Sequence, residues 1–417
     1  MRCLCATPYL RRILDPTPPI INHAQSGAQT DGDEAPIMRT KSGLPKRRAL
    51  RNKPEFEYGF GTNPETAKVR HPSLNGNRDE NGIDVLSLFS GCGGLDLGFM
   101  GGFRFGGKHY KALPFQIAKA IDNNTRAIDT YNLNLGEHGE VGDLLKITAA
   151  ELPQCRVLIG GFPCQDFSSS GPKVGFDGSR GQLYRVLVNY MRQHRPLVVV
   201  GENVPHLKRL RNGEYLRTIV AEFESCGYDV DVWELYGPDY GLPQSRRRLF
   251  IVCTRNDLIG RPTVPVPTHA HRHVSIDEAI GDLIDIRDEA VTNQSQYFVA
   301  TKATSGGGQG DHTNKRGEVA YCIRANAKAR IQFHYELPRR LTVRECARLQ
   351  SFPDEFVFPG AAMTNMEQIG NAVAPIMGHA VASSIADFLA RLERGEASAA
   401  PRRRLHRQEE LFARTPT

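Results

Sequence analysis

The nine cysteines of this 417-residue chain include no CxxC pair. Pairs at that spacing are typical of zinc ribbons and redox motifs, so their absence argues against such sites. Scattered free thiols are typical of a reducing cytoplasm, where we expect the protein to act. Three alternating histidines have metal-binding chemistry, but in a proline-rich loop such side chains are commonly solvated, and we expect no metal cofactor. They are His269, His271 and His273.

Long apolar runs are also missing. No stretch of the sequence reaches the roughly 18 consecutive apolar residues of a membrane span, so we expect no membrane partner. The first residues, MRCLCATPYLRRILDPTPPII, bring charge and proline too early for a secretory signal. The formal net charge of +7 is a mild basic excess, which permits a polyanionic partner and also suits an ordinary soluble enzyme.

The texture of the sequence changes at Asp84. Short apolar runs, DVLSLF, FQIAKAI, CRVLIG and PLVVVG, alternate with amphipathic stretches such as 125–135 and 181–194. Buried strands that alternate with helices predict an α/β fold with a parallel sheet. Residues 228–235 and 246–253 predict a hairpin pair at one edge of that sheet, and helices are expected at 341–352 and about 375–392.

These patterns divide the chain into five parts. A disordered basic arm is expected at 1–82, followed by a catalytic and cofactor-binding domain at 83–255. An irregular stretch at 256–337 predicts a separate small domain or a functional insertion. The chain then returns to the catalytic domain at 338–395 and ends in a charged tail at 396–417.

A glycine turn, SGCGG, follows the first apolar run and leads into a helix-like stretch. Its glycines permit positive φ and a close approach of backbone to ligand: they are Gly91, Gly93 and Gly94. The dinucleotide fingerprint G-x-G-x-x-G fails, because Asp96 stands at its last glycine. Asp122 and Asp143 follow the second and third expected strands, where acids can hold ribose hydroxyls and an adenine amino group. Together these residues predict an adenosine ligand without a pyrophosphate.

The stretch GGFPCQDFSSSG leaves a third apolar run through two glycines, a proline and Cys164. A cysteine at a strand end beside a small polar loop suits a nucleophile, and it also suits an ordinary turn. Glu202 follows the PLVVVG run, and carboxyl ends of parallel strands share one sheet edge. Taken singly, a structural cysteine, a helix-capping glutamate and a solvated SRRR surface are the alternatives for these motifs.

Six motifs stand in one order along the chain: SLFSGCGG, GFPCQDFS, GENV, PQSRRRLFIV, RRLTVRECARLQSFP and QIGNAV. In that order and spacing the sequence resembles the DNA (cytosine-5)-methyltransferases, from about Asp84 to Leu392. The resemblance implies a Rossmann-like methyltransferase fold with a seventh, antiparallel strand, and a small, irregular, β-rich target-recognition domain at 256–337. It also implies S-adenosylmethionine as the cofactor, which explains the missing pyrophosphate fingerprint.

The resemblance assigns seven residues to the cofactor pocket. They are Phe89 against the adenine, Gly91, Gly93 and Gly94 along the methionine side, Asp122 at the ribose, Asp143 at the adenine amino group, and Asn371 completing the pocket. The family often has Glu where this sequence has Asp122. The shorter acid keeps the charge, so we expect ribose to be held slightly differently.

The resemblance also implies a covalent mechanism. The thiolate of Cys164 would add to C6 of cytosine and turn C5 into a nucleophile for the methyl group. Glu202 would protonate or hydrogen-bond N3, which requires a raised carboxyl pKa. Arg246 is expected to contact the base O2 and the thiolate side, and Arg246 and Arg248 together to favour the thiolate.

The target carbon lies inside a duplex, so the nucleotide must be extruded. The loop after the cysteine resembles the family's mobile loop that closes over DNA, although a plain surface loop has the same composition. The glycine-rich stretch TSGGGQGDHTNKRG is expected to read base edges in the major groove. The DNA contacts expected from these two segments are Gln165, Ser168, Lys173, Arg180, Gln309 and Arg316.

We therefore expect a methyltransferase that modifies cytosine C5 in a short duplex sequence, in a restriction–modification system or as a solitary methylase. Double-stranded DNA is its expected partner, with a cognate endonuclease sharing its recognition sequence. We expect a monomer in the cytoplasm, associated with the nucleoid. Three alternatives remain: a tRNA methyltransferase, a catalytically idle DNA-binding relative and a nicotinamide oxidoreductase. The sequence lacks the Cys-Phe-Thr signature of the tRNA-methylating branch. Intact Pro163, Cys164 and Glu202 speak against an idle relative, and Asp96 in the glycine turn speaks against an oxidoreductase.

Overall fold

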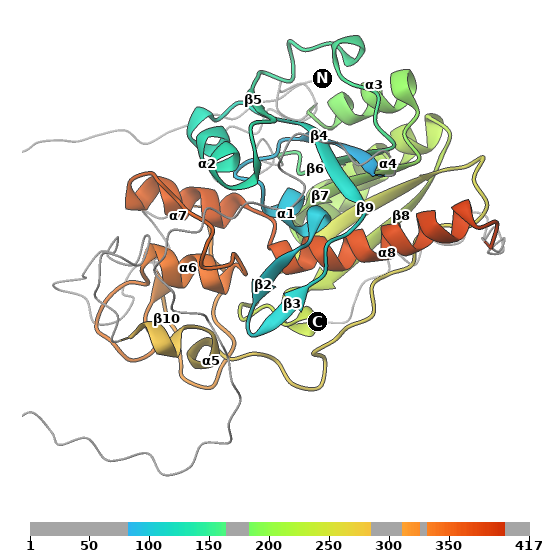
Figure 1. Cartoon of the computed structure of the whole chain (residues 1–417). Helices are drawn as coiled ribbons and strands as arrows, with labels where there is room; N and C mark the ends of the chain where they lie inside the picture. The colour runs from blue at the N-terminus through green and yellow to red at the C-terminus, as the bar shows by residue number, and fades with distance from the viewer. Residues whose placement is uncertain (1–81, 164–182, 285–310, 326–331, 397–417) are drawn as a thin grey trace, which may run out of the picture. The chain divides into compact units, whose positions relative to one another are not determined.

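The computed structural model describes residues 82–163, 183–284, 311–325 and 332–396 (Figure 1). Its centre is a seven-stranded sheet in the order β5-β4-β1-β6-β7-β9-β8. The strands are β1 (Ile83–Leu88), β4 (Phe115–Asp122), β5 (Gly139–Val141), β6 (Val157–Gly160), β7 (Val198–Asn203), β8 (Tyr228–Tyr236) and β9 (Arg247–Arg255). The first five are parallel, whereas β9 is antiparallel to both β7 and β8. The parallel sheet, the antiparallel strand and the edge hairpin are thus confirmed.

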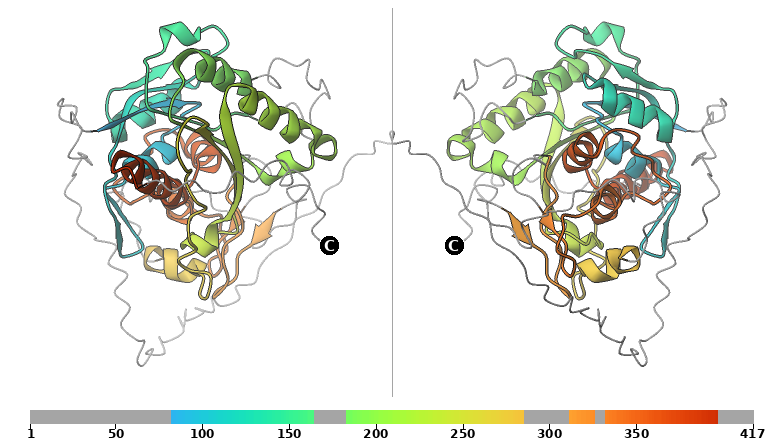
Figure 2. Two further views of the ribbon diagram at one scale, coloured as in Figure 1. Left: turned by 90° about the vertical axis from the view of Figure 1, so that its right-hand side faces the viewer. Right: turned by 90° about the vertical axis from the view of Figure 1, so that its left-hand side faces the viewer.

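The sheet is covered on both faces, as the near-continuous apolar strands predict. In β7, Val198 and Val200 join one hydrophobic cluster and Val199 joins the other, because successive side chains point to opposite faces. Helices α1 (Gly94–Met100) and α8 (Pro375–Glu393) contribute to the first cluster. Helices α3 (Tyr184–His194) and α4 (Glu214–Ser225) contribute to the second, on the opposite side of the sheet (Figures 1 and 2).

Several helices begin and end where the sequence predicts. Helix α2 (Thr125–Leu135) is capped by Asn124, whose side chain accepts a hydrogen bond from the Ala127 amide. Sequence reasoning did not anticipate α4, α7 (Ala362–Asn371) or the hairpin of β2 (Phe103–Phe105) and β3 (Lys108–Tyr110). Short 3-10 helices lie at Ala149–Glu151, Pro205–Lys208, Leu210–Gly213, Gly237–Tyr240 and Gly281–Leu283.

The region between β9 and the next long helix has little regular structure in its described residues. It holds α5 (Ile276–Ile280), which starts at a capping box on Ser275, and two short parallel strands. These are β10 (His312–Thr313) and β11 (Gln332–Phe333). Residues 285–310 and 326–331 lie outside the description, so the β-rich character expected for 256–337 stays a prediction.

Helix α6 (Val343–Leu349) is buried along its whole length, including its charged residues. Arg344 donates to the carbonyl oxygens of Pro353 and Phe356 at 3.0 and 2.7 Å. Arg348 pairs with Asp354 and Asp282. The arginines of the RECAR motif therefore serve packing, by satisfying buried polar groups at the end of the helix.

One helical stretch, Ala362–Glu393, is long and apolar enough to cross a membrane by length and composition. It comprises α7 and α8, and 78% of its most apolar window is buried inside the protein. Met377, Val381 and Ile385 belong to the cluster on the first face of the sheet. The apolar character of this stretch is therefore accounted for by the core.

Gly98 closes the contact between α1 and α8. A Cβ at this position would lie 2.6 Å from the Pro375 carbonyl oxygen and 2.7 Å from the His379 amide nitrogen. We expect Gly98→Ala to lower the free energy of unfolding by about 1–3 kcal/mol, because backbone must move to make room. Denaturant unfolding measures the loss. In the control Gly281→Ala, the new methyl group meets only the Tyr335 hydroxyl at 3.4 Å; equal losses in the two variants would contradict the packing argument.

Candidate active site

A cavity of about 770 Å³ opens at the carboxyl ends of β1, β4, β6 and β7. The turns after these strands and the end of α7 form its wall, which is where an open α/β sheet binds its ligand. Seven residues predicted from the sequence line it: Phe89, Gly91, Asp122, Asp143, Glu202, Arg248 and Asn371. The fold thus places five of the predicted cofactor residues and the predicted acid, Glu202, in the wall of one cavity.

The turn after β1 lines this cavity and holds a residue with a strained backbone. Phe89 has φ of 57°, a left-handed conformation that is rare for a bulky side chain and clusters at functional sites. Gly91 has φ of 55°, and a Cβ added to it would meet no atom within 4 Å. The backbone at Gly91 therefore faces open space, as a ligand cradle requires.

Asp122 is held at the end of β4 by backbone donors. Its Oδ2 accepts from the Gly91 amide at 2.9 Å and its Oδ1 from the Asn124 amide at 2.8 Å. Burial raises the pKa of Asp122, and these amide donors oppose the rise. Asp143 lies across the cavity, with Oδ1 accepting from the Leu145 amide at 3.1 Å.

Gly93 and Gly94 lie behind the cavity wall. A Cβ on Gly93 would collide with Leu135 and Tyr131, and one on Gly94 would collide with the Val373 carbonyl oxygen. Neither glycine is among the residues lining the cavity. They allow close packing of α1 against α2 and the QIGNAV turn, and the contact expected along the methionine side stays a prediction.

Glu202 and Arg248 form an ion pair in the cavity. The Arg248 Nε lies 2.8 Å from Glu202 Oε1, and both side chains are largely buried. Burial raises the pKa of Glu202, while the positive charges of Arg248 and Arg246 work in the opposite direction. Burial thus shifts the pKa of Glu202 in the direction that general-acid chemistry needs.

The backbone after β6 explains the two glycines of GGFPC. A Cβ on Gly160 would lie 2.9 Å from the Leu88 carbonyl oxygen, and one on Gly161 would lie 3.1 Å from Glu202 Oε2. Asn203 donates to the Phe162 carbonyl oxygen at 2.9 Å, which ties this loop to the end of β7. The loop therefore runs beside Glu202 up to Pro163, the last described residue before Cys164.

Arg246 occupies a different place from the one expected. Its fully buried guanidinium donates to the carbonyl oxygens of Ile323, Gly370 and Ala372 at 2.9, 3.0 and 2.7 Å. It is not among the residues that line the cavity, and these contacts are with backbone. Burial lowers its pKa to about 10, which leaves it charged at neutral pH. Arg248 is the arginine that reaches Glu202.

Gln244 extends the same junction and was not singled out from the sequence. Its Nε2 donates to the Leu349 carbonyl oxygen at 2.7 Å, and its Oε1 accepts from the Ile323 amide at 2.9 Å. The motif PQSRRR was the one sequence signal for Gln244. A glutamine two residues before a buried arginine can form hydrogen bonds with the same backbone segments as that arginine. Gln244 and Arg246 thus join β9 to residues 320–323, α6 and the QIGNAV turn.

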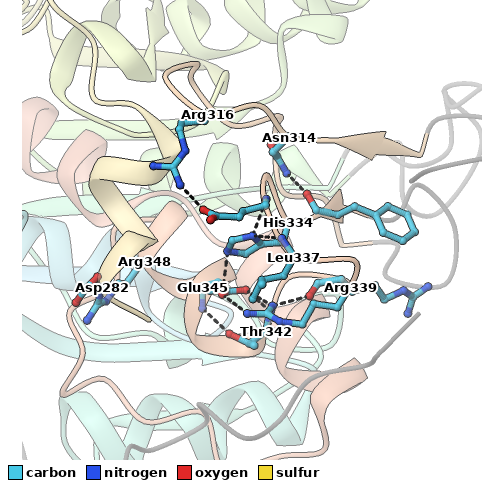
Figure 3. A network of polar contacts seen from close by, with 12 residues as sticks. Asp282, Asn314, Arg316, His334, Leu337, Arg339, Thr342, Glu345 and Arg348 are labelled. Atoms are coloured by element: carbon cyan, nitrogen blue, oxygen red, sulfur yellow. Dashed lines mark hydrogen bonds and ion pairs between the residues drawn. The ribbon is translucent and has the colours of Figure 1, made fainter. Parts of the chain in front are cut away.

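Arg316, expected to read DNA, is engaged within the protein. Its guanidinium pairs with Glu336, lies 3.7 Å from Asp277 Oδ2 and stacks 5.0 Å from the Tyr335 ring centroid. Figure 3 shows Arg316 above the polar group of His334, Glu345 and Arg339, where Arg339 binds both oxygens of Glu345 at 2.7 and 2.8 Å. The remaining predicted positions lie outside the described residues: Cys164, Gln165, Ser168, Lys173, Arg180 and Gln309.

The histidine-rich loop makes ordinary contacts. His273 Nε2 lies 2.9 Å from Asp239 Oδ1, and His269 Nδ1 lies 2.8 Å from the Thr268 hydroxyl. Within the ranges that the structure describes, no three His, Cys, Asp or Glu side chains converge to hold a metal ion.

Comparison with known proteins decides the family. Residues 83–387 match the model of the C-5 cytosine-specific DNA methylases. The chain belongs to this family. Among its relatives are the type II methyltransferases M.NgoFVII of Neisseria gonorrhoeae and M.BspRI of Lysinibacillus sphaericus, each 32% identical. The alignments cover 72% and 74% of this chain and 86% and 82% of the two relatives.

Solved structures share the fold of this DNA (cytosine-5)-methyltransferase. A DNA modification methyltransferase encoded within an E. coli prophage superimposes with a TM-score of 0.58 at 22% identity, over 75% of this chain and 99% of that one. The Dnmt2 methyltransferase of S. pombe gives a TM-score of 0.55 at 21% identity, over 72% and 98%. At these identities the likeness concerns the fold.

The cofactor of the family is S-adenosylmethionine, and the residues present fit it. Asp122 offers a preoriented carboxylate for ribose hydroxyls, Phe89 an aromatic ring and Gly91 an open backbone cradle. Two further polar atoms in the cavity wall, Ser90 Oγ and Gln368 Oε1, are buried without a hydrogen-bond partner among the described residues. Unpartnered buried polar atoms in a ligand cavity indicate partners supplied on binding.

Asp122→Asn should weaken cofactor binding by about tenfold or more. An amide cannot accept from both the Gly91 and Asn124 amides, so the side chain loses its orientation, a penalty of order 1–3 kcal/mol. Isothermal titration with S-adenosylmethionine measures the dissociation constant. Asp129→Asn, an exposed change on the following helix, is the control. An unchanged dissociation constant in folded Asp122→Asn would exclude the ribose role.

Proposed function

We propose that this enzyme methylates C5 of one cytosine in a specific short duplex sequence through a covalent bond between Cys164 and C6 of the extruded base. The observation that carries the proposal is the Glu202–Arg248 pair, buried in the same cavity as Asp122 and Phe89. The loop that leads to Cys164 is hydrogen-bonded to Asn203, the residue after Glu202, through the Phe162 carbonyl oxygen. An acid, a cofactor wall and the approach to a thiol therefore share one sheet edge.

Each residue has a chemical task in this scheme. The Cys164 thiolate attacks C6, and Glu202 donates a proton or hydrogen bond to N3, which makes the ring a better acceptor. Arg248 holds the Glu202 carboxyl in place and contributes positive charge near the base. When bound, S-adenosylmethionine supplies an electrophilic methyl group. Arg246 keeps the Gly370–Ala372 backbone and β9 in register, so that both sides of the cavity stay aligned.

The biological setting follows from the relatives. Several are type II methyltransferases, so we infer that methylation by this chain protects its recognition sequence from a cognate restriction endonuclease. The shared partner would be the DNA sequence itself. A monomer acting in the cytoplasm on nucleoid DNA is consistent with this setting.

A labelling experiment tests the proposed activity. Purified protein is incubated with methyl-labelled S-adenosylmethionine and either plasmid DNA or tRNA. Label is expected in DNA, as 5-methylcytosine at one recurring sequence. Label confined to tRNA would overturn the DNA assignment, and label in neither substrate would indicate a relative without activity.

Cys164→Ala should abolish the covalent adduct. Wild-type enzyme with S-adenosylmethionine and an oligonucleotide carrying 5-fluorocytosine at the target should form a stable protein–DNA complex, because after methyl transfer to C5 the fluorine cannot leave as the proton does. Intact-mass and peptide mass spectrometry locate the linkage. The variant should still bind S-adenosylmethionine, since the mapped cofactor residues are unchanged. An adduct at another side chain would remove Cys164 from the mechanism.

Turnover should fall as pH rises through the raised pKa of Glu202, because the protonated carboxyl is the active form. Arg248→Gln removes a positive charge that lowers this pKa, so the alkaline limb of the kcat profile should move to higher pH, with a lower maximum. Arg247→Gln, an exposed neighbour, is the control. If the limb stays at the same pH in Arg248→Gln, Glu202 is not the titrating acid.

A further inference from the structure

A basic segment, PHLKRLRNG at 205–213, follows the Glu202-Asn203 motif directly. It holds four basic residues, none of which is used by the cavity chemistry described above: His206, Lys208, Arg209 and Arg211. Basic runs of this kind are often solvated surface, so their geometry decides whether they form a binding surface.

Two leucines anchor the segment. It forms two 3-10 helices, Pro205–Lys208 and Leu210–Gly213, and the side chains of Leu207 and Leu210 are 0% and 8% exposed in the cluster beneath α3 and α4. Because these leucines point inward, the basic residues between and around them point outward. His206, Arg209 and Arg211 are exposed, and we call these three residues the basic ridge.

The end of the ridge is held in an unusual backbone conformation. Arg211, Asn212 and Gly213 are consecutive left-handed residues, with φ of 48°, 54° and 83°. Such a conformation is unfavourable for arginine and persists only where surrounding contacts enforce it. One such contact is the hydrogen bond from Arg217 Nη2 to the Asn212 carbonyl oxygen at 3.2 Å. The ridge is therefore fixed before any partner binds, which lowers the entropy cost of binding.

The ridge reaches the active-site cavity through one of its three residues. His206 lines that cavity together with Glu202 and Arg248. Lys208 forms a salt bridge of 3.1 Å with Glu234 on β8, whose neighbour Leu235 pairs with Arg248 of β9. One cation of the segment thus serves to fasten it beside the catalytic arginine. Arg209 forms no ion pair among the described residues, so its charge is available.

We propose that the basic ridge binds backbone phosphates of duplex DNA next to the extruded nucleotide. This inference rests on the proposed function, because an enzyme that rotates a nucleotide about its backbone must hold the flanking phosphates. Phosphate contacts position the duplex without reading sequence, and arginine is well suited to them. The ridge therefore supplies affinity and register at the catalytic cavity.

The test compares DNA binding by full-length wild-type protein and Arg209→Ala, using a duplex that carries the methylated sequence. Loss of one phosphate contact should reduce the slope of log K against log salt by about 1 and weaken binding at every sequence alike. The KM for DNA should rise, whereas kcat at saturating DNA and the dissociation constant for S-adenosylmethionine should stay unchanged. Arg192→Ala, an exposed arginine on α3, is the matched control.

Two further variants keep the test decisive. Arg209→Lys keeps the charge and should retain most of the wild-type salt slope, whereas Arg209→Glu should weaken binding more than alanine does. A wild-type slope and KM in Arg209→Ala, or equal behaviour of the Lys and Glu variants, would overturn the ridge. Failure of the proposed function is seen separately, as wild-type protein that puts no methyl group on DNA cytosine.

Discussion

A buried guanidinium holds the two sides of the active-site cavity together. Arg246 donates to carbonyl oxygens of Ile323, Gly370 and Ala372, three positions far from it in the chain. A charge taken out of water must find partners, and here the partners are the backbone of the cofactor wall and of the segment beyond the insertion. Arg246 directly precedes β9, and Arg248 lies within it, so one short segment both anchors the wall and places the arginine that binds Glu202.

Burial shifts the pKa values of Glu202 and Arg246 in opposite directions. It raises the pKa of Glu202, which favours a proton on the carboxyl, and lowers the pKa of Arg246 to about 10, which still leaves the guanidinium charged. Burial therefore moves the Glu202 carboxyl toward its protonated form, while the Arg246 guanidinium keeps its charge. The ion pair with Arg248 limits the rise in the pKa of Glu202 and also holds its carboxyl group in place. One contact therefore affects both the acidity and the orientation of this side chain.

The family motifs divide into chemistry and framework once their contacts are known. Asp122, Glu202 and Arg248 face the cavity. Gly93, Gly94 and the arginines of RECAR serve packing, by close backbone approach or by bonds to buried carbonyl oxygens. Arg316 pairs with Glu336 and Asp277 at the surface, and its expected contact with DNA stays a prediction. A motif in sequence therefore does not distinguish residues that touch a ligand from those that hold the wall.

The local sequence pattern alone predicted the strands, several helices and the shared sheet edge. Continuous apolar runs indicate strands buried on both faces, and apolar residues at helical spacing indicate helices. The order of motifs was enough to indicate the family and the cofactor, and it singled out Glu202, which the structure places in the cavity. Only the tertiary structure decided that Arg248 rather than Arg246 reaches Glu202, and that the basic ridge is exposed on a segment that reaches the cavity at His206. Arg246, which precedes β9, is buried against the carbonyl oxygens of Ile323 and Gly370, more than 70 positions away in the chain, and such distant contacts are not encoded in the neighbouring residues.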